Sequence, residues 1–335
     1  MIAKKSSFVV HFIDVGQADA ILVLCDGKAM LIDGGNADDS NLIYAYLKKL
    51  KVTHLDYIVC THAHEDHVGG LAGALKYATV GTAYCPVTSY DSKAFKNFVT
   101  YLKKRKVSIS VPSAGDEFSL GSAFVTIIGP INDSDEPNNT SIVMRVVYGK
   151  TSFLFAGDAE RDEEQDILDA GYTLESTVLK VGHHGSETST TYPFLREIMP
   201  KYAVISVGAD NSYGHPDEDT LSRLRDADVK VYRTDLQGDI ICTSDGNTVT
   251  FKVERNANAD TLAPVGENSL QSSDYETSSD TPVSTEYILN TSTKKFHYPW
   301  CSSVKQMKES NKKTFTGSRA DLIAQGYSPC KNCNP

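Results

Sequence analysis

Three of the nine histidines in this 335-residue chain fall within six residues, directly after an apolar run that predicts a buried strand. The run is Tyr57–Cys60, and the cluster that follows it contains His62, His64, Asp66 and His67. Imidazole and carboxylate are the ligands that Zn²⁺ and its first-row neighbours prefer. Because His62 and His64 are two residues apart, they share one face, whereas Asp66 and His67 begin the next element and can serve a second ion about 3.5–4 Å away. The pattern predicts a metal site, and the alternative is a polar surface loop rich in histidine.

Strands and helices alternate along most of the chain, which indicates an α/β protein. Three strand-like runs come first, and the third ends at Asp33 before a glycine pair. Apolar residues at helical spacing follow over residues 41–51. The last three strand-like runs, which we expect to complete a second sheet, are 229–233, 239–243 and 248–253.

The histidine cluster resembles a known motif. The run from His62 to Gly70, His-Ala-His-Glu-Asp-His-Val-Gly-Gly, matches the HxHxDHxGG motif of the metallo-β-lactamase superfamily. This resemblance implies an αββα sandwich with a hydrolytic site for one or two metal ions at the edge between its sheets. Two further runs are similar to the hydrolase domain of the ComEC competence proteins: Asp14-Val-Gly-Gln-Ala-Asp-Ala, in which Ala18 replaces the usual glycine, and Lys180-Val-Gly-His-His-Gly-Ser.

The same resemblance implies roles for residues outside the first cluster. Asp33 matches an aspartate that orients a metal-bound histidine through a hydrogen bond. Asp158 ends a buried strand and matches the carboxylate that bridges two ions, although Gly-Asp is also a common turn. His184 matches the ligand of the second ion in a His-x-Ser motif. Asn139 and Ser141 match the Asn-x-Ser pattern that replaces a third histidine near the first ion, so we expect that ion to be held less strongly.

Four side chains are candidates for catalytic contact with the substrate or its water. Either Asp66 or Asp158 is expected to hold the attacking water. His183 is expected to face the substrate, where it or His215 could protonate the leaving oxygen, or to support its neighbour. Lys180 alternates with His184 along a strand and is predicted near a phosphate, although the pattern equally fits a structural lysine. His215 lies in a Gly-His-Pro run that matches the last histidine of the family, which implies a proton donor or phosphate contact; a turn histidine is the alternative.

The periodic pattern ends at Arg255, so we predict a hydrolase domain over residues 1–255. From 256 to 285, ten of thirty residues are Ser or Thr and no helix or strand period is sustained, which predicts a flexible linker. Residues 286–335 then form a separate small module. The predicted fold is therefore an αββα sandwich, a linker and a small terminal module.

The terminal module carries a second predicted metal site. His297 and Cys301 form an HxxxC pattern, and Cys330 and Cys333 form a CxxC pattern. One imidazole and three thiolates complete a tetrahedral structural Zn²⁺ site, and a segment this small needs such a staple to fold. Two disulfides are the alternative, which the presence of only three cysteines weakens. The pattern resembles small Ada-like zinc modules.

Charge is unevenly distributed along the chain. The formal net charge is −10, and residues 287–335 contain eight Lys or Arg against two acidic residues, so residues 1–286 carry −16. The basic tail predicts contact with nucleic acid or a surface, or simply solvates the module. No apolar run reaches the ~18 residues of a membrane span. No signal peptide is readable in the first residues, and the sequence leaves secreted and cytoplasmic locations open.

These observations predict a metal-dependent phosphodiesterase or nuclease that uses two divalent ions, Zn²⁺ or Mn²⁺, and the resemblance to the ComEC hydrolase domain implies that it acts on DNA. Two divalent ions would ionise a water near neutral pH and neutralise the charge that builds on phosphate oxygens. Two alternatives stay open. One is a small-molecule ester hydrolase, such as a phosphorylcholine esterase or lactonase, which the acidic body favours; the other is a non-catalytic binding scaffold.

Overall fold

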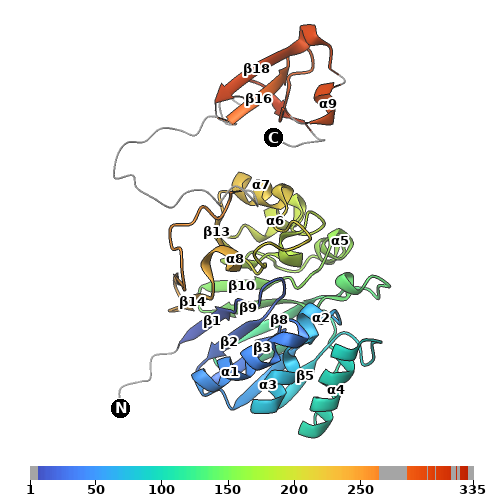
Figure 1. Cartoon of the computed structure of the whole chain (residues 1–335), viewed down its shortest axis with the longest axis vertical. Coiled ribbons are helices and arrows are strands. Elements are labelled where there is room, and N and C mark those ends of the chain that lie inside the picture. Colours follow the sequence, from blue (N-terminus) through green and yellow to red (C-terminus); the bar gives the residue numbers. More distant parts are fainter. Residues whose placement is uncertain are drawn as a thin grey trace. The chain divides into compact units, whose positions relative to one another are not determined.

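The computed structural model in Figure 1 describes residues 7–263, 285–299, 301–305, 307–317, 322 and 325–330. The chain forms two compact units, residues 1–269 and 270–335. Residues 256–263, which begin the predicted linker, contact the first unit: Arg225 Nη2 donates to the Leu262 carbonyl at 2.8 Å and Arg233 Nη1 to that of Ala263 at 3.0 Å. This segment therefore lies on the body.

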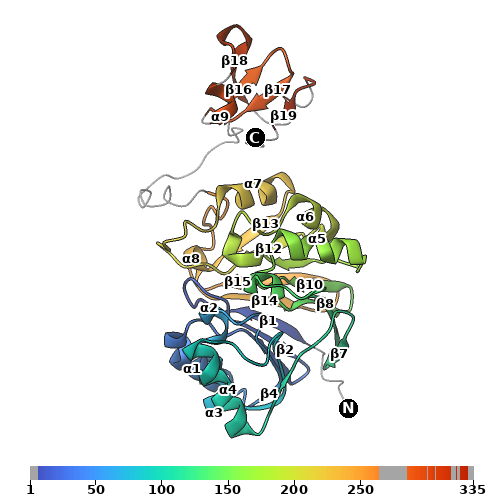
Figure 2. The same cartoon turned by 90° about the vertical axis from the view of Figure 1, so that its right-hand side faces the viewer.

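The first unit is built on two β-sheets that pack face to face (Figures 1 and 2). The first sheet has eight strands in the order β15 (Val249–Val253), β14 (Ile240–Ser244), β1 (Phe8–Phe12), β2 (Ile21–Cys25), β3 (Lys28–Ile32), β4 (His54–Val59), β5 (Thr79–Tyr84) and β6 (Ile109–Ser110). The strands from β1 to β3 form an antiparallel meander, and those from β3 to β6 run parallel.

The second sheet has seven strands, and the four that come last in the sequence run parallel. Their order is β13 (Lys230–Arg233), β12 (Tyr202–Ile205), β11 (Val178–Lys180), β10 (Thr151–Phe155), β9 (Val143–Tyr148), β8 (Ala123–Gly129) and β7 (Glu117–Leu120). Of the three runs expected here, only β13 joins this sheet. The prediction for the other two was wrong, because β14 pairs with β1 and β15 with β14. Alternating apolar residues identify a strand with one buried face, but they do not specify its partner.

Helices cover the outer face of each sheet, and this arrangement confirms the predicted αββα sandwich (Figures 1 and 2). Residues of α1 (Ser40–Leu50), α3 (Leu71–Tyr77) and α4 (Lys93–Arg105) form a core with the first sheet. Residues of α5 (Arg161–Ala170), α6 (Tyr192–Ile198) and α7 (Glu218–Asp226) form another core with the second sheet. Short helical turns lie in the loops: α2 (Glu65–Val68), α8 (Thr234–Gln237), η1 (Ala37–Asp39), η2 (Pro137–Thr140) and η3 (Gly182–Gly185).

The layer between the sheets is packed with aromatic side chains. Phe8 and Phe12 of β1 face Phe153 and Phe155 of β10, and the Phe8 and Phe153 ring centroids are 4.8 Å apart. Each fully buried Phe contributes about 1.5–3 kcal/mol relative to an exposed one. This packing fixes the position of one sheet against the other. The loops at the carboxyl ends of the parallel strands, on both sheets, consequently meet at a common edge.

The second unit is a four-stranded sheet in the order β18 (Lys312–Gly317), β16 (Thr285–Asn290), β17 (Lys295–His297) and β19 (Ser328–Pro329), with short turns at α9 (Ser302–Lys305) and η4 (Glu309–Asn311). Among its described residues, the apolar core contains four buried side chains, Tyr287, Leu289, Phe296 and Leu322. Such a core is small for a stable fold. Within the part of the chain that the structure describes, no helix is long and apolar enough to cross a membrane.

Candidate metal centre

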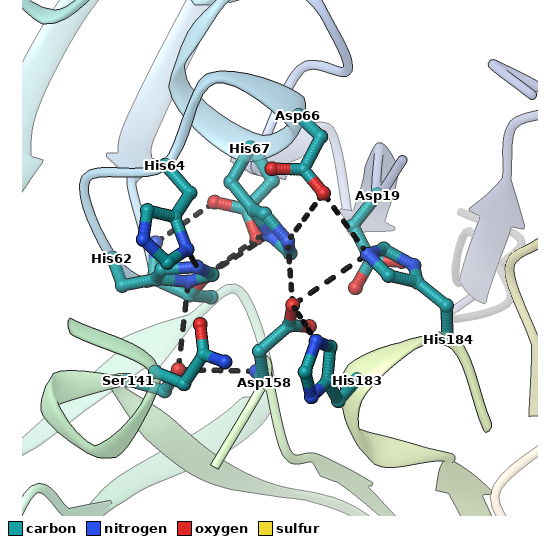
Figure 3. Close-up of polar contacts among 12 residues, drawn as sticks. Asp19, His62, His64, Asp66, His67, Ser141, Asp158, His183 and His184 are labelled. Atoms are coloured by element: carbon teal, nitrogen blue, oxygen red, sulfur yellow. Dashed lines mark hydrogen bonds and ion pairs between the residues drawn. The ribbon is translucent and has the colours of Figure 1, made fainter. Parts of the chain in front are cut away.

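Four side chains from both sheets converge at the common edge (Figure 3). Asp66, His67, Asp158 and His184 each present one ligand atom, and these four atoms lie within 4.8 Å of one another. His67 Nε2 is 3.1 Å from Asp158 Oδ2, and His184 Nε2 is 3.2 Å from Asp66 Oδ2. The loops that follow β4, β10 and β11 supply these residues. Segments more than a hundred residues apart in the sequence thus build one cluster.

His62 and His64 lie beside this cluster on the loop after β4. His62 Nε2 is 3.1 Å from His64 Nδ1, and the His62 and His67 ring centroids are 4.1 Å apart. His62 is fully buried. The first histidine pair therefore faces the same space as Asp158 and His67, as Figure 3 shows.

The glycines that follow the cluster allow a close approach of two loops. The backbone of Gly70 passes so near the loop after β3 that a Cβ on Gly70 would lie 1.8 Å from the Gly34 carbonyl oxygen. Gly34 N also donates to the His67 carbonyl at 2.8 Å. The loop after β3 is therefore held against α2, and the first residue of this loop, Asp33, lies directly behind His67.

Hydrogen bonds orient two of the imidazoles. Asp33 Oδ2 accepts from His67 Nδ1 at 2.8 Å and from Thr61 Oγ1 at 2.7 Å, so His67 presents Nε2 to Asp158. His184 Nδ1 donates to the Ser206 carbonyl at 3.0 Å, so its Nε2 faces Asp66. Bonds of this kind fix the tautomer and ring orientation of metal-binding histidines.

A left-handed turn separates the two adjacent histidines of η3. His183 has φ 46° and ψ 49°, and His184 has φ 52° and ψ 21°. Such residues cost about 1 kcal/mol or more each, so the surrounding structure must enforce the turn. His183 N donates to the Gly157 carbonyl at 3.1 Å, next to Asp158. The turn sends His184 into the cluster and leaves His183 with its Nδ1 3.1 Å from Glu160 Oε1.

The Asn-x-Ser run, residues 139–141, forms hydrogen bonds with the backbone of Asp158 and Glu160. Ser141 Oγ accepts from the Asp158 backbone N–H at 3.0 Å and lies 3.5 Å from His62 Nδ1. Asn139 Oδ1 accepts from the Glu160 N–H at 3.0 Å. Ser141 therefore contacts the cluster directly, whereas Asn139 fixes the loop that carries Asp158.

The carboxylates and imidazoles of the cluster shift one another's pKa values strongly. Burial lowers the pKa of His67, but Asp158, Asp33 and Asp66 outweigh burial and raise it well above the usual range. His184 behaves in the same way, since Asp158 and Asp19 overcome the effect of burial and raise its pKa to about 10. The pKa of Asp158, which burial alone would raise, is held well below its usual range by His67 and His184. The buried carboxylates therefore require positive charge at their centre.

The residues present fit divalent ions. Asp158 Oδ1 is buried and has no hydrogen-bond partner among the described residues. A carboxylate flanked by imidazole Nε2 atoms on two sides is a suitable bridge between two cations. The cluster is thus consistent with a site for two metal ions.

A pocket of about 370 Å³ opens over the cluster. It is lined by Gln17, His64, Glu65, Asp66, Asn138, Asp158, His183, His184, Tyr213 and His215. The His183 and His215 ring centroids are 5.7 Å apart, so both predicted proton donors lie at this pocket. His215 Nδ1 is 3.3 Å from Asp217 Oδ2. None of the described lining residues is Lys or Arg.

Lys180 lies away from the pocket, and its position does not fit the predicted phosphate contact. Its side chain is fully buried between the sheets, with Nζ 2.7 Å from Asp19 Oδ2 and donating to the Val181 carbonyl at 2.9 Å. Asp19 Oδ1 in turn is 3.5 Å from His184 Nδ1. Inward-facing positions of β11 are spaced by two residues, so Lys180 shares the inner face with Val178. The lysine therefore contacts His184 indirectly, through Asp19, and does not line the pocket.

Several site residues were missed by the sequence reasoning. Asp19 lies in the run compared with the ComEC domain, which was a usable signal. Thr61, Asn138, Glu160 and Tyr213 carried no such signal, because their partners come from other loops. Glu160 Oε1, for example, accepts from Thr188 Oγ1 at 2.9 Å and from Asn138 Nδ2 at 3.3 Å.

The second unit contains a separate cluster of possible ligands. His297, Cys301 and Cys330 are buried, and their ligand atoms lie within 4.8 Å of one another. Both ring nitrogens of His297 are buried without a hydrogen-bond partner among the described residues. This set fits a zinc ion; the fourth predicted ligand, Cys333, lies outside the described residues. In the first unit, Cys25, Cys60, Cys85 and Cys242 are buried cysteines without a disulfide.

Comparison with known proteins identifies the family. Residues 13–209 match the model of the metallo-beta-lactamase superfamily. ComE operon protein 3 of Bacillus subtilis is 28% identical over 263 residues, which cover 73% of this chain and 34% of that protein. Competence protein ComA of Neisseria gonorrhoeae is 30% identical over 228 residues, which cover 67% and 30%.

The chain thus spans about a third of the length of these relatives. Among solved structures, the metallo-beta-lactamase fold protein YhfI of Bacillus subtilis aligns with a TM-score of 0.49 at 13% identity, covering 72% of this chain and 100% of that one. On the extent of the family match, together with the sandwich and its histidine and aspartate cluster, the chain belongs to the metallo-beta-lactamase superfamily.

Proposed function

We propose that this protein is a metal-dependent phosphodiesterase that cleaves DNA with the help of two divalent cations, Zn²⁺ or Mn²⁺. The observation that carries the proposal is the convergence of four ligand atoms from both sheets within 4.8 Å. Competence protein ComA and ComE operon protein 3 are among its relatives, and the resemblance to the ComEC hydrolase domain favours DNA as the substrate.

Two overlapping ligand sets would hold the cations. His62, His64 and Asp158 would bind the first, and Asp66, His67, Asp158 and His184 the second. Bound cations would supply an ionised water near neutral pH and offset negative charge on the phosphate oxygens. In the second unit, His297, Cys301, Cys330 and Cys333 would hold a structural Zn²⁺.

Side chains at the pocket then position the substrate and move protons. Asp66 is 31% exposed in its side chain and borders the pocket, so its carboxylate can orient the attacking water. His183 Nδ1 lies against Glu160, and its Nε2 is 3.9 Å from Asp158 Oδ2. This orientation lets Nε2 pass a proton to the leaving oxygen. His215 lies at the same rim as the second donor.

The test combines metal analysis with two substrates. The purified protein should contain up to three ions per chain and cleave both single-stranded DNA and bis-p-nitrophenyl phosphate. Asp66→Ala and His184→Ala should each lower both activities by at least about 100-fold, since losing even a supporting residue costs 10–100-fold. His54→Ala is the matched control, because His54 is half-exposed and bonds to Thr79 Oγ1 outside the site. Full DNA cleavage by the Asp66 and His184 variants would remove the nuclease assignment.

A small-molecule ester hydrolase is the second candidate. The observation that favours it is the absence of Lys and Arg among the described lining residues of the pocket. Cleavage of bis-p-nitrophenyl phosphate or p-nitrophenylphosphorylcholine without cleavage of DNA would support this candidate. Metal binding without either activity would support a binding scaffold.

A further inference from the structure

Tyr213 is an exposed aromatic residue at the mouth of the pocket. Its relative exposure is 71%, the highest among the described large apolar side chains. Its ring stacks on His215 with centroids 5.7 Å apart and an angle of 19° between planes. One face of the tyrosine is therefore supported by an imidazole, and the ring borders the same pocket as Asp158 and His183.

The loop that carries Tyr213 is held by one amide. Asn211 Nδ2 donates to the carbonyls of Gly208 at 2.9 Å and His215 at 2.6 Å. Asn211 Oδ1 accepts from the backbone N–H groups of Tyr213 at 3.2 Å and His215 at 3.1 Å. An exposed ring on a braced loop loses little conformational freedom when a ligand stacks on it.

Asn138, which borders the same pocket, carries an unpaired acceptor. Asn138 is only 7% exposed, and its Nδ2 donates to Glu160 Oε1. Because a carboxylate only accepts, the amide orientation is fixed, and Oδ1 is left buried with no partner among the described residues. A buried carbonyl without a partner costs about 1–3 kcal/mol, so a ligand that brings an N–H or O–H group would be favoured here.

The composition of the pocket narrows the ligand further. With no Lys or Arg among its described lining residues, the pocket offers no cation from the chain to pair with a second phosphate. Stacking on an aromatic ring and a neutral acceptor recognise a flat, uncharged group with polar hydrogens. A nucleobase with its sugar meets both requirements.

We infer that Tyr213 and Asn138 form a nucleotide subsite, in which an unpaired base stacks on Tyr213 while the adjacent phosphodiester lies at the metal cluster. The substrate is therefore single-stranded nucleic acid, since a base in a duplex has both faces covered. This inference rests on the proposed phosphodiesterase function and adds the identity of the group next to the scissile bond. A quaternary ammonium group could also stack on Tyr213. It has no N–H to donate to Asn138, so the base is the better fit.

The test is a cycle between Tyr213 and the base. Two single-stranded oligonucleotides of equal length are compared, one with natural bases and one with abasic tetrahydrofuran residues. For the metal-loaded wild type, kcat/KM should be about 10- to 100-fold higher on the natural oligonucleotide, the range expected when one base stacks. Tyr213→Ala should abolish this preference while retaining the rate on the abasic oligonucleotide, and Tyr213→Phe should keep it. Phe124→Ala, which removes another exposed ring, should change neither rate.

Equilibrium binding of the same two oligonucleotides, followed by fluorescence anisotropy, separates the subsite from the chemistry. If neither oligonucleotide is cleaved, the proposed function fails. The subsite would still be supported if the protein binds the natural oligonucleotide more tightly than the abasic one and Tyr213→Ala removes this difference. Equal losses on both oligonucleotides in Tyr213→Ala, or no loss on either, would overturn it. Turnover of p-nitrophenylphosphorylcholine that depends on Tyr213, with no discrimination between the oligonucleotides, would assign the ring to a quaternary ammonium group instead.

Discussion

The buried ion pair between Lys180 and Asp19 should be sensitive to loss of one partner and tolerant of loss of both. The side chains of Lys180 and Asp19 are 0% and 2% exposed, and Nζ and Oδ2 are 2.7 Å apart. Lys180→Met leaves a buried carboxylate without its cation, which costs about 3–5 kcal/mol. For a unit of this size, 1 kcal/mol lowers Tm by about 2–4 °C, so we expect a fall of about 6–20 °C.

Replacing both charges should recover most of this loss. In Asp19→Asn with Lys180→Met, neither side chain is ionised, and replacing a buried pair by neutral groups is often without net cost. Denaturant unfolding followed by far-UV circular dichroism gives the free energy of unfolding for the wild type, both single variants and the double variant. The coupling free energy between the two positions should be at least about 2 kcal/mol. Additive effects, or a loss below about 1 kcal/mol in Lys180→Met, would show that the pair does not hold this part of the fold.

The same variants decide between two roles for Lys180. If the lysine acts only by supporting Asp19 and His184, the double variant should regain the proposed phosphodiesterase activity together with stability. If it contacted a phosphate, activity would stay low in the stable double variant. Asp19→Asn keeps a polar atom near His184 Nδ1, which Asp19 Oδ1 approaches to 3.5 Å, so it is the appropriate partner change.

Two further predictions concern sites away from the cluster. Glu163 is buried on α5 and accepts from the Ile131 N–H at 2.9 Å, and burial, with Asp166 nearby, raises its pKa to about 7. Because the folded pKa lies above that of an exposed glutamate, the contribution of Glu163 to stability is complete below about pH 4.5 and is lost as pH rises through about 7. Between pH 6 and 8, Tm should therefore fall by about 3 °C more in the wild type than in Glu163→Gln. Equal falls in the two proteins would contradict this prediction. Cys301→Ser should lower the zinc content by about one ion per chain, whereas Cys25→Ser, which alters a buried thiol of the first unit, should leave it unchanged.

The sequence predicted the parts of this site that depend on local pattern. Apolar runs that stop at His62, Asp158 and His184 correspond to β4, β10 and β11, and parallel strand ends bring these residues to one edge. What it did not predict depends on partners distant in the sequence. The pair Asp19–Lys180 joins two sheets, and β14 with β15 joined the first sheet because β1 offered an open edge there.

Local pattern alone also does not specify how neighbouring residues of one type diverge; for the histidine pair, the resemblance to the family motif is what singled out His184 as the expected ligand. Asn138 and Asn139 are adjacent, yet Asn138 borders the pocket and Asn139 caps the backbone of Glu160. Likewise His183 and His184 separate through a left-handed turn that no apolar period encodes. In both cases the direction of a side chain is set by contacts with another loop.

Because carboxylates are buried at this edge of the sandwich, cation binding there should be thermodynamically linked to folding. Asp19, Asp33 and Asp158 are nearly inaccessible to solvent, and Lys180 supplies one fixed positive charge against them. In the polypeptide alone, the remaining balance comes from protons on His67 and His184, whose pKa values the carboxylates raise despite burial. A protonated imidazole cannot bind a metal ion, so each cation that enters must displace protons. Cation affinity should therefore rise with pH. Cation binding should also stabilise the contact between the two sheets, because the ligands of each cation come from loops of both sheets.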